Sequence, residues 1–324
     1  TITYTKSGDP LNGLSITVPS GAYATSVQWT VTADSTAHAT LPADVVQVGP
    51  MLTISNDQGY AESAMTLRMP LSIPDSLALV PFYYDSATQT FEGIPLVERT
   101  ETSVTLATYH FSRDFLAIPA NVSETSALRS SMRLPFGEVK MVWAVTPKLR
   151  LNGTFSSNFR AAVDNWEFVN YGDYISPGGM CLGMSVTAMY YHFFHRAVGE
   201  PGLYGHYDKS IPDQLDNVQG IRFAGAVQAD YEDRARRGID QRAILDAQGL
   251  ARGTRVDNLS SSWILLTLKV TSRPVMLAVY GPEGAHALIA YSATSSGSTR
   301  AALSKLTLSG TRCSEWVGTT VYSA

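Results

Sequence analysis

The chain has 324 residues, a formal net charge of -4 and 44% hydrophobic residues. This length favours two domains, and the apolar content is sufficient for a buried core, so a single small module and a disordered chain are both excluded. The sequence contains no run of Lys and Arg, which argues against a nucleic-acid partner because binding to phosphates depends on clustered positive charge. No segment has the roughly 20 apolar residues of a membrane-spanning helix, so no membrane span is expected.

The first 121 residues alternate apolar and polar side chains, which is typical of half-buried strands. Four such runs are residues 14–18, 27–31, 78–84 and 90–97. Short turn sequences rich in Gly, Asn, Asp and Ser separate the runs, as antiparallel strands require. We therefore expect residues 1–121 to form an all-β sandwich without a helix of three turns.

Residues 122–147 mix Ser, Arg and Lys with short apolar pieces around two prolines, a composition that favours a linker. The charge balance also differs along the chain: residues 1–121 hold 4 Lys and Arg against 11 Asp and Glu, whereas the remainder holds 20 against 17. We therefore expect a domain boundary here, followed by a second domain at residues 148–324.

Helical patterns appear only in this second part. Residues 181–198, 221–237 and 259–270 are predicted to be helices, the last of them stopped by Pro274. Two apolar runs then surround a turn at residues 281–284, which predicts a hairpin of residues 275–280 and 286–291 buried on both faces. The second domain is therefore expected to be α+β.

A cysteine stands at the predicted start of the first of these helices. Cys181 follows Gly178 and Gly179, and the positive end of a helix lowers the pKa of a thiol, which reacts as the thiolate. A nucleophilic cysteine also needs a base. His192 lies eleven residues further on, about 16 Å along a helix axis, so it is too distant. His286 opens a buried strand after a tight turn, and we choose it as the base.

Three segments resemble the papain-like cysteine peptidases, especially their bacterial C39-like branch. They are Gly-Gly-Met-Cys-Leu-Gly-Met at residues 178–184, the strand at residues 274–279 and Gly-Ala-His-Ala-Leu-Ile at residues 284–289. The resemblance covers about residues 150–300 and implies a papain-like fold in which Cys181 is the nucleophile and His286 the base. It also implies an oxyanion donor upstream of the cysteine, a position that Asn170 fills. A peptide or protein substrate and no cofactor are expected.

The sequence departs from that family at one point: no Asn or Asp follows His286 to orient its ring. Two hypotheses therefore stand. In the first, the protein is a thiol hydrolase that cleaves peptide or isopeptide bonds through a thioester. In the second, a catalytically inactive papain-like scaffold belongs to a binding or surface protein. Cys181 also has two simpler interpretations, a buried inert thiol and a disulfide with Cys313.

The first domain carries a second resemblance. Residues 13–22, the hairpin beginning at residues 82–85 and His110-Phe111-Ser112 resemble a ZU5-like β-sandwich. Some members of that group cleave themselves at His-Phe-Ser through the serine hydroxyl, so Ser112 is a candidate nucleophile. The alternative is that the motif simply closes the last strand of the domain.

Two further expectations concern ligands and location. His192, His195 and His206 have a spacing that allows a zinc site, but their aromatic neighbours favour core packing, and no metal is expected. Few Lys, many Ser and Thr and the lack of an initiator Met favour a secreted or cell-surface protein. The sequence predicts no oligomeric state.

Overall fold

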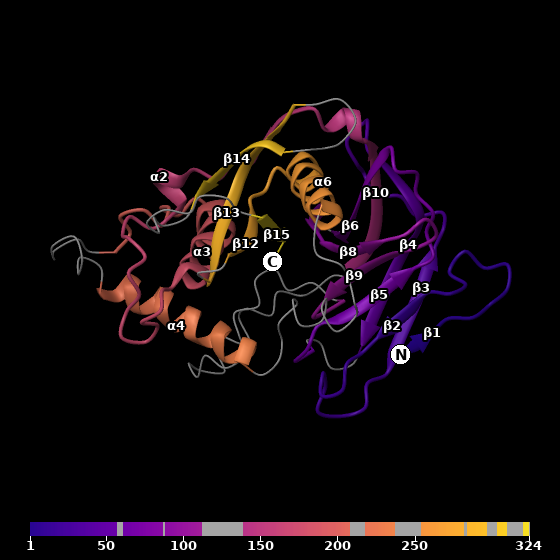
Figure 1. Cartoon of the computed structure of the whole chain (residues 1–324), viewed down its shortest axis with the longest axis horizontal. Coiled ribbons are helices and arrows are strands. Elements are labelled where there is room, and N and C mark those ends of the chain that lie inside the picture. The colour runs from indigo at the N-terminus through magenta and orange to yellow at the C-terminus, as the bar shows by residue number, and fades with distance from the viewer. Residues whose placement is uncertain are drawn as a thin grey trace.

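The computed structural model describes residues 1–56, 61–86, 88–111, 139–207, 218–236, 254–281, 284–296, 303–309 and 320–323. It contains three antiparallel sheets and few helices (Figure 1). The sheets and the longest helices stack as successive layers (Figure 1).

Two five-stranded sheets form a β-sandwich. The first sheet contains, in spatial order, β1 (Ile2–Thr3), β2 (Ser15–Thr17), β5 (Met65–Met69), β9 (Val104–Thr108) and β8 (Leu96–Arg99). The second contains β3 (Trp29–Asp34), β4 (Val46–Asn56), β10 (Val139–Pro147), β6 (Leu77–Asp85) and β7 (Thr90–Gly93).

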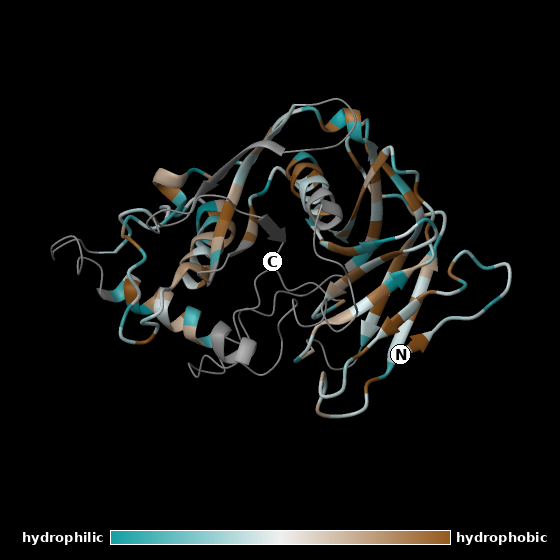
Figure 2. Ribbon diagram, viewed as in Figure 1, coloured by the Kyte–Doolittle hydropathy of each residue, from teal (hydrophilic) through white to brown (hydrophobic). Residues whose placement is uncertain are grey.

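The two sheets enclose one hydrophobic core. Its buried side chains include Ile16, Leu67 and Leu106 of the first sheet and Leu52 and Trp143 of the second. Hydrophobic and polar residues alternate along many of these strands (Figure 2), because a strand directs successive side chains to opposite faces. Within the described part of residues 1–111, the regular elements are all strands, which confirms the predicted β-rich first half.

Strand β10 differs from the expected linker at residues 122–147. It is a central strand of the second sheet, paired with β6 from Val139↔Asp85 to Pro147↔Leu77 and with β4 on its other side. Residues 141–145 are all buried. The strand therefore lacks the alternation of apolar and polar residues that predicts the other strands of the sandwich. The sandwich therefore takes a strand from beyond the predicted boundary, and residues 122–138 lie outside the described residues.

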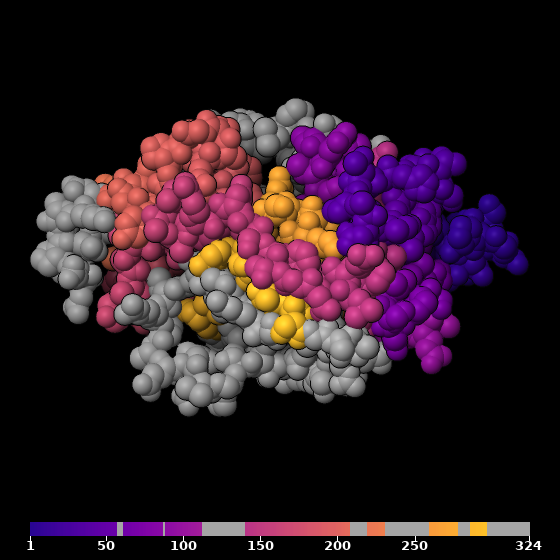
Figure 3. All heavy atoms as spheres, turned by 90° about the horizontal axis from the view of Figure 1, so that it is seen from above, coloured from indigo at the N-terminus to yellow at the C-terminus, as the bar shows by residue number. Residues whose placement is uncertain are grey.

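Helix α6 (Thr254–Thr271) separates the sandwich from a third sheet. That sheet is formed by β11 (Gly153–Ser156), β13 (Gly284–Ser295), β12 (Val275–Gly281) and β15 (Thr320–Ser323), with β14 (Leu303–Ser309) also paired to β13. One buried cluster joins the three layers through Ile264 and Leu265 of α6, Phe82 of β6, Leu277 of β12 and Ala290 of β13. Orange atoms of α6 are visible between the purple sandwich and the pink part of the chain (Figure 3).

Helices α3 (Cys181–Tyr190) and α4 (Val218–Arg236) lie on the other side of the third sheet. The chain continues from α3 as a π-helical turn at Tyr191–His195 and a 3-10 turn at Arg196–Val198. Two short helical segments, η1 (Lys148–Leu151) and α2 (Ala161–Asp164), precede them. The three predicted helices and the predicted hairpin are confirmed. In the described part of the chain, none of the helices combines the length and hydropathy needed to cross a membrane.

Candidate functional site

Cys181 is the first residue of α3 and carries a half-buried thiol. From Gly183 to Met189 the helix is buried, so packing in the core fixes α3. The first two residues of the helix, Cys181 and Leu182, are partly exposed. The N-terminal end of a helix stabilises a thiolate through its dipole and its amide groups. Cys313, the partner in the disulfide interpretation, lies outside the described residues.

Two side-chain amides hold the start of α3 on either side of this thiol. Asn170 Oδ1 accepts a hydrogen bond from the Met180 N–H at 2.6 Å, and Gln228 Oε1 of α4 accepts one from the Gly183 N–H at 2.9 Å. These bonds satisfy amides that a helix start would otherwise leave without a partner. The first turn of α3 is therefore fixed in position around Cys181.

The predicted approach of Asn170 to the cysteine helix is thus present. The Met180 N–H is a donor, so the Asn170 atom that faces it has to be the carboxamide oxygen. The amino group of Asn170 can then donate a hydrogen bond to a different acceptor. Asn170 lies against Gly179, whose φ of +115° strongly favours glycine. The catalytic role of Asn170 remains a prediction.

The sulfur of Cys181 contacts the strand that carries His286. The Ala287 N–H of β13 donates a hydrogen bond to Cys181 Sγ at 3.4 Å. Strand N–H groups point sideways, in the plane of the sheet. In the described residues, pairing of β13 with β14 begins only at Ile289. The sulfur therefore lies beside the edge of β13, next to His286.

His286 is buried, with 8% of its surface exposed. Its cross-strand neighbour is Val279 of β12. Residues on one strand alternate between faces: Ile289 packs in the cluster that contains α3, and Ala290 packs in the cluster that contains α6. By this alternation the side chain of His286 leaves the strand on the α6 face. A sulfur at the strand edge is accessible from either face. A nucleophile and its base need to lie within about 4 Å of each other, and this distance between Cys181 Sγ and the His286 ring remains a prediction.

His192 and His195, which follow α3, each have a separate carboxylate partner. His192 Nδ1 lies 3.4 Å from Asp164 Oδ2, and its Nε2 lies 3.0 Å from Asn158 Oδ1. His195 Nδ1 lies 2.6 Å from Glu200 Oε2. Among the described residues, no three His, Cys, Asp or Glu side chains form a group that could hold a metal ion. His192 is buried and lies beside the ring of Phe159, as in the core interpretation.

The polar group around the buried Asp164 was not predicted from the sequence. Asp164 Oδ2 contacts Arg196 and His192 and accepts a hydrogen bond from the Arg160 N–H at 2.6 Å. In the sequence, the only indication of this group is that Arg196 follows His192 by four residues, a spacing that places both side chains on one side of a helix. This group is separated from Cys181 by the length of α3, so it supports the fold around the site rather than the thiol itself.

The His110-Phe111 part of the possible self-cleavage motif follows β9. Tyr83 Oη and Thr108 Oγ1 both donate to the His110 carbonyl, at 2.5 and 2.7 Å, and burial raises the pKa of Tyr83. Phe111 is buried against Trp29, with ring centroids 5.6 Å apart. Ser112, the candidate nucleophile, lies outside the described residues.

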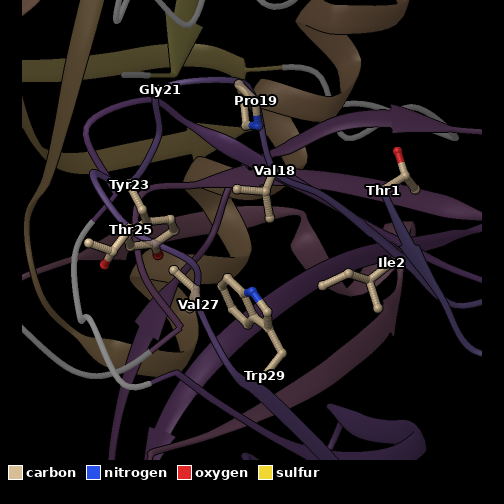
Figure 4. Close-up of a pocket in the computed structure, with 9 residues that line it drawn as sticks. All are labelled: Thr1, Ile2, Val18, Pro19, Gly21, Tyr23, Thr25, Val27 and Trp29. Carbon is tan, nitrogen blue, oxygen red and sulfur yellow. The ribbon is translucent and has the colours of Figure 1, made fainter.

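A pocket lies on the sandwich, and Cys181 is not among the residues that line it (Figure 4). Its lining consists of Thr1, Ile2, Val18, Pro19, Gly21, Tyr23, Thr25, Val27 and Trp29. These side chains include no carboxylate, imidazole or thiol, so the pocket offers none of the groups considered above for catalysis.

Comparison of the chain with protein-family models, with curated proteins and with solved structures finds no match.

Proposed function

We propose that residues 148–324 form a papain-like cysteine peptidase of the C39-like type, preceded by a ZU5-like sandwich, that hydrolyses peptide or isopeptide bonds. The observation that best supports this proposal is the 3.4 Å hydrogen bond from the Ala287 amide to Cys181 Sγ. It joins a thiol at a helix start to the one strand segment that carries the proposed base. Such a pairing of nucleophile and base is the minimum that thiol hydrolysis requires.

In the proposed reaction, His286 takes the thiol proton and the Cys181 thiolate attacks the carbonyl carbon of the scissile bond. The tetrahedral oxyanion collapses, the C–N bond breaks, and His286 returns the proton to the leaving amine, which leaves a thioester. His286 then takes a proton from water as it attacks the thioester. Collapse of this second intermediate releases the carboxylic acid and regenerates the thiol.

The same geometry supplies a candidate oxyanion site. The Asn170 amino group and the helix-start N–H of Cys181 are the two donors, and the Asn170–Met180 hydrogen bond holds Asn170 next to the residue that precedes Cys181. Fixed donors aimed at developing negative charge are worth about 3 kcal/mol each in related chemistry. A secreted or cell-surface location is proposed with this activity.

Alkylation by iodoacetamide tests the reactive thiol directly. Rates of Cys181 modification, located by mass spectrometry, should be fast at neutral pH and should fall steeply in His286→Ala because the thiolate loses its partner. His38→Ala, which changes an exposed histidine of the sandwich, is the matched control and should leave the rate unchanged. Peptide hydrolysis should be lost in Cys181→Ala and fall by about 10² to 10⁴ in His286→Ala.

A second candidate function is a binding protein with an inactive scaffold. The alternation that directs His286 to the α6 face favours it. In that case Cys181 should react no faster than an ordinary cysteine, its rate should follow a pKa of about 8.5, and His286→Ala should not alter it. That result would replace the peptidase proposal.

A further inference from the structure

The loop that leads into α3 exposes large apolar side chains beside the candidate nucleophile. In this loop, residues 170–180, Tyr174 is 100% exposed, Tyr171 68% and Ile175 42%. Isolated exposed apolar residues are common, whereas a group of them within five residues is a typical feature of a contact surface. We call these three residues the apolar group of the loop.

Hydrogen bonds within the loop fix its shape. Asp173 Oδ1 accepts from the N–H groups of Ile175 and Ser176, at 2.9 and 2.6 Å. Ser176 is buried, with its Oγ donating to the Gly225 carbonyl of α4 at 3.3 Å. The turn that presents Tyr174 is therefore attached to α4, and a preformed surface loses little entropy when a ligand binds.

The one charged group of this loop is directed towards Gly225 of α4 and away from the exposed apolar side chains. Asp173 is the only charged residue between positions 170 and 180. Its Oδ1 is occupied by the two amides and its Oδ2 is buried. The loop thus presents aromatic and aliphatic surface without a charge that would attract a basic or an acidic side chain, and this favours an uncharged apolar ligand group.

The two ends of the loop meet next to the thiol. Asn170 Oδ1 and the Met180 N–H are 2.6 Å apart, and Cys181 follows Met180. Tyr174 stands four residues from Asn170, so its Cα lies at most about 14 Å from that of Asn170. A peptide in extended conformation, with its scissile carbonyl at Cys181 Sγ, covers that distance in about four residues.

We propose that Tyr171, Tyr174 and Ile175 bind an uncharged apolar side chain of the peptide substrate, within about four residues of the cleaved bond. This inference deepens the proposed peptidase function and depends on it for the identity of the ligand as a substrate. The loop then selects apolar residues, while Cys181 and His286 carry out the chemistry.

Positional-scanning hexapeptide pools, each with one residue fixed as Phe, Leu, Asp or Lys, test this preference on the full chain. Hydrolysis is measured by the release of new amines. At one position the Phe and Leu pools should be cleaved at least about tenfold faster than the Asp and Lys pools, which is the discrimination that one apolar contact supplies. Tyr174→Ser should lose this preference and Tyr174→Phe should keep it. Tyr204→Ser, which changes a 47% exposed tyrosine outside the loop, is the matched control.

A second arm separates this inference from the proposed function. Immobilised Cys181→Ala protein is exposed to the same pools, and the retained peptide is quantified. Greater retention of the Phe and Leu pools that disappears in Cys181→Ala/Tyr174→Ser supports the apolar group even where the native chain hydrolyses no pool. The inference is overturned if Tyr174→Ser cleaves the pools with unchanged preference, or if Cys181→Ala/Tyr174→Ser retains them as Cys181→Ala does. Either result holds whether or not the peptidase proposal stands. Rapid iodoacetamide labelling of Cys181 in Tyr174→Ser shows that the thiol is intact.

Discussion

The carboxylate of Asp164 has no exposed surface. Burial raises its pKa, but hydrogen bonds from His192, from the Arg160 amide and from Arg196 outweigh this effect and hold the pKa below the ordinary value of 3.8. The second oxygen, Oδ1, is buried without a hydrogen-bond partner among the described residues. Asp164 is therefore ionised inside the structure and depends on the hydrogen bonds that these three groups donate.

Asp164→Asn should lower the free energy of unfolding at pH 7 by about 1.5 to 3 kcal/mol, because it removes the buried negative charge that accepts from the partly exposed Arg196. The folded pKa is lower than the unfolded one, so the stabilisation from ionisation is complete above pH 3.8 and is lost as the pH falls through and below that value. Urea unfolding at pH 7 and pH 3 should show a smaller difference between the two proteins at pH 3.

Glu101→Gln is the control for this prediction, because Glu101 is exposed at the bend between β8 and β9. It should change the free energy of unfolding by less than about 0.5 kcal/mol at either pH. A penalty for Asp164→Asn that is the same at pH 7 and pH 3 would contradict the assignment of an ionised Asp164.

Asn170 combines two roles that a single substitution can separate. Asn170→Asp keeps the oxygen that accepts the Met180 N–H but removes the amino donor. The thermal midpoint should therefore change little, while kcat for peptide hydrolysis should fall by about 10² to 10³, the effect of removing one oxyanion donor. The pH profile of alkylation monitors any shift in the thiol pKa. If kcat persists in Asn170→Asp, Asn170 is only a cap for the helix start.

At the scale of elements, the approach of α3 to α4 depends on Gly183. A Cβ at this position would lie 1.9 Å from the Ala224 carbonyl oxygen and 2.8 Å from the backbone nitrogen of Gln228. Gly183→Ala should therefore separate the two helices, weaken the Gln228 hydrogen bond and reduce stability by about 1 to 3 kcal/mol.

Gly178→Ala provides the comparison, since no atom lies within 4 Å of the added carbon. Thermal unfolding should distinguish the two alanine variants. The alkylation rate of Cys181 should also fall in Gly183→Ala only, because the start of α3 is then no longer held. Equal thermal midpoints for the two variants would exclude this role of the helix contact.

The sequence predicts many of the elements because their signals are local. The aromatic run after Cys181 and the stop at Pro274 indicate α3 and the end of α6 without reference to the rest of the chain. The run at residues 90–97 shows the limit. It divides into β7 and β8, which belong to different sheets, because a change of sheet is decided by pairing with strands far away in sequence.

The candidate site shows the same limit. Its motifs place Cys181 at a helix start, Asn170 upstream of it and His286 on a strand, and all three positions agree with the structure. Which face of β13 carries His286 cannot be predicted, because the run His-Ala-Leu-Ile-Ala-Tyr has no alternation and the register with β12 alone decides it. The apolar group of the loop was likewise missed, since exposure depends on packing against α4.

At the scale of the whole molecule, α6 belongs to two cores at once. Its side chains pack against the second sheet of the sandwich and against the third sheet. Lys269 of α6 also contacts Asp44 of the sandwich at 2.5 Å and donates to the Arg150 carbonyl at 2.9 Å. The segments expected to be two domains are therefore connected through continuous apolar packing, and relative motion between them would expose this surface.

This arrangement predicts that the chain unfolds as one unit. Leu265→Ala removes a fully buried side chain between the sandwich and the third sheet and should cost about 2 to 5 kcal/mol. Ile16→Ala, in the core of the sandwich, should cost a similar amount. In scanning calorimetry each variant should shift one common transition, because a sandwich without α6 leaves the outer face of β6 and β10 in water. Two transitions, of which Ile16→Ala moves only one, would show that the sandwich is stable without α6, and the proposed peptidase would then be separable from it.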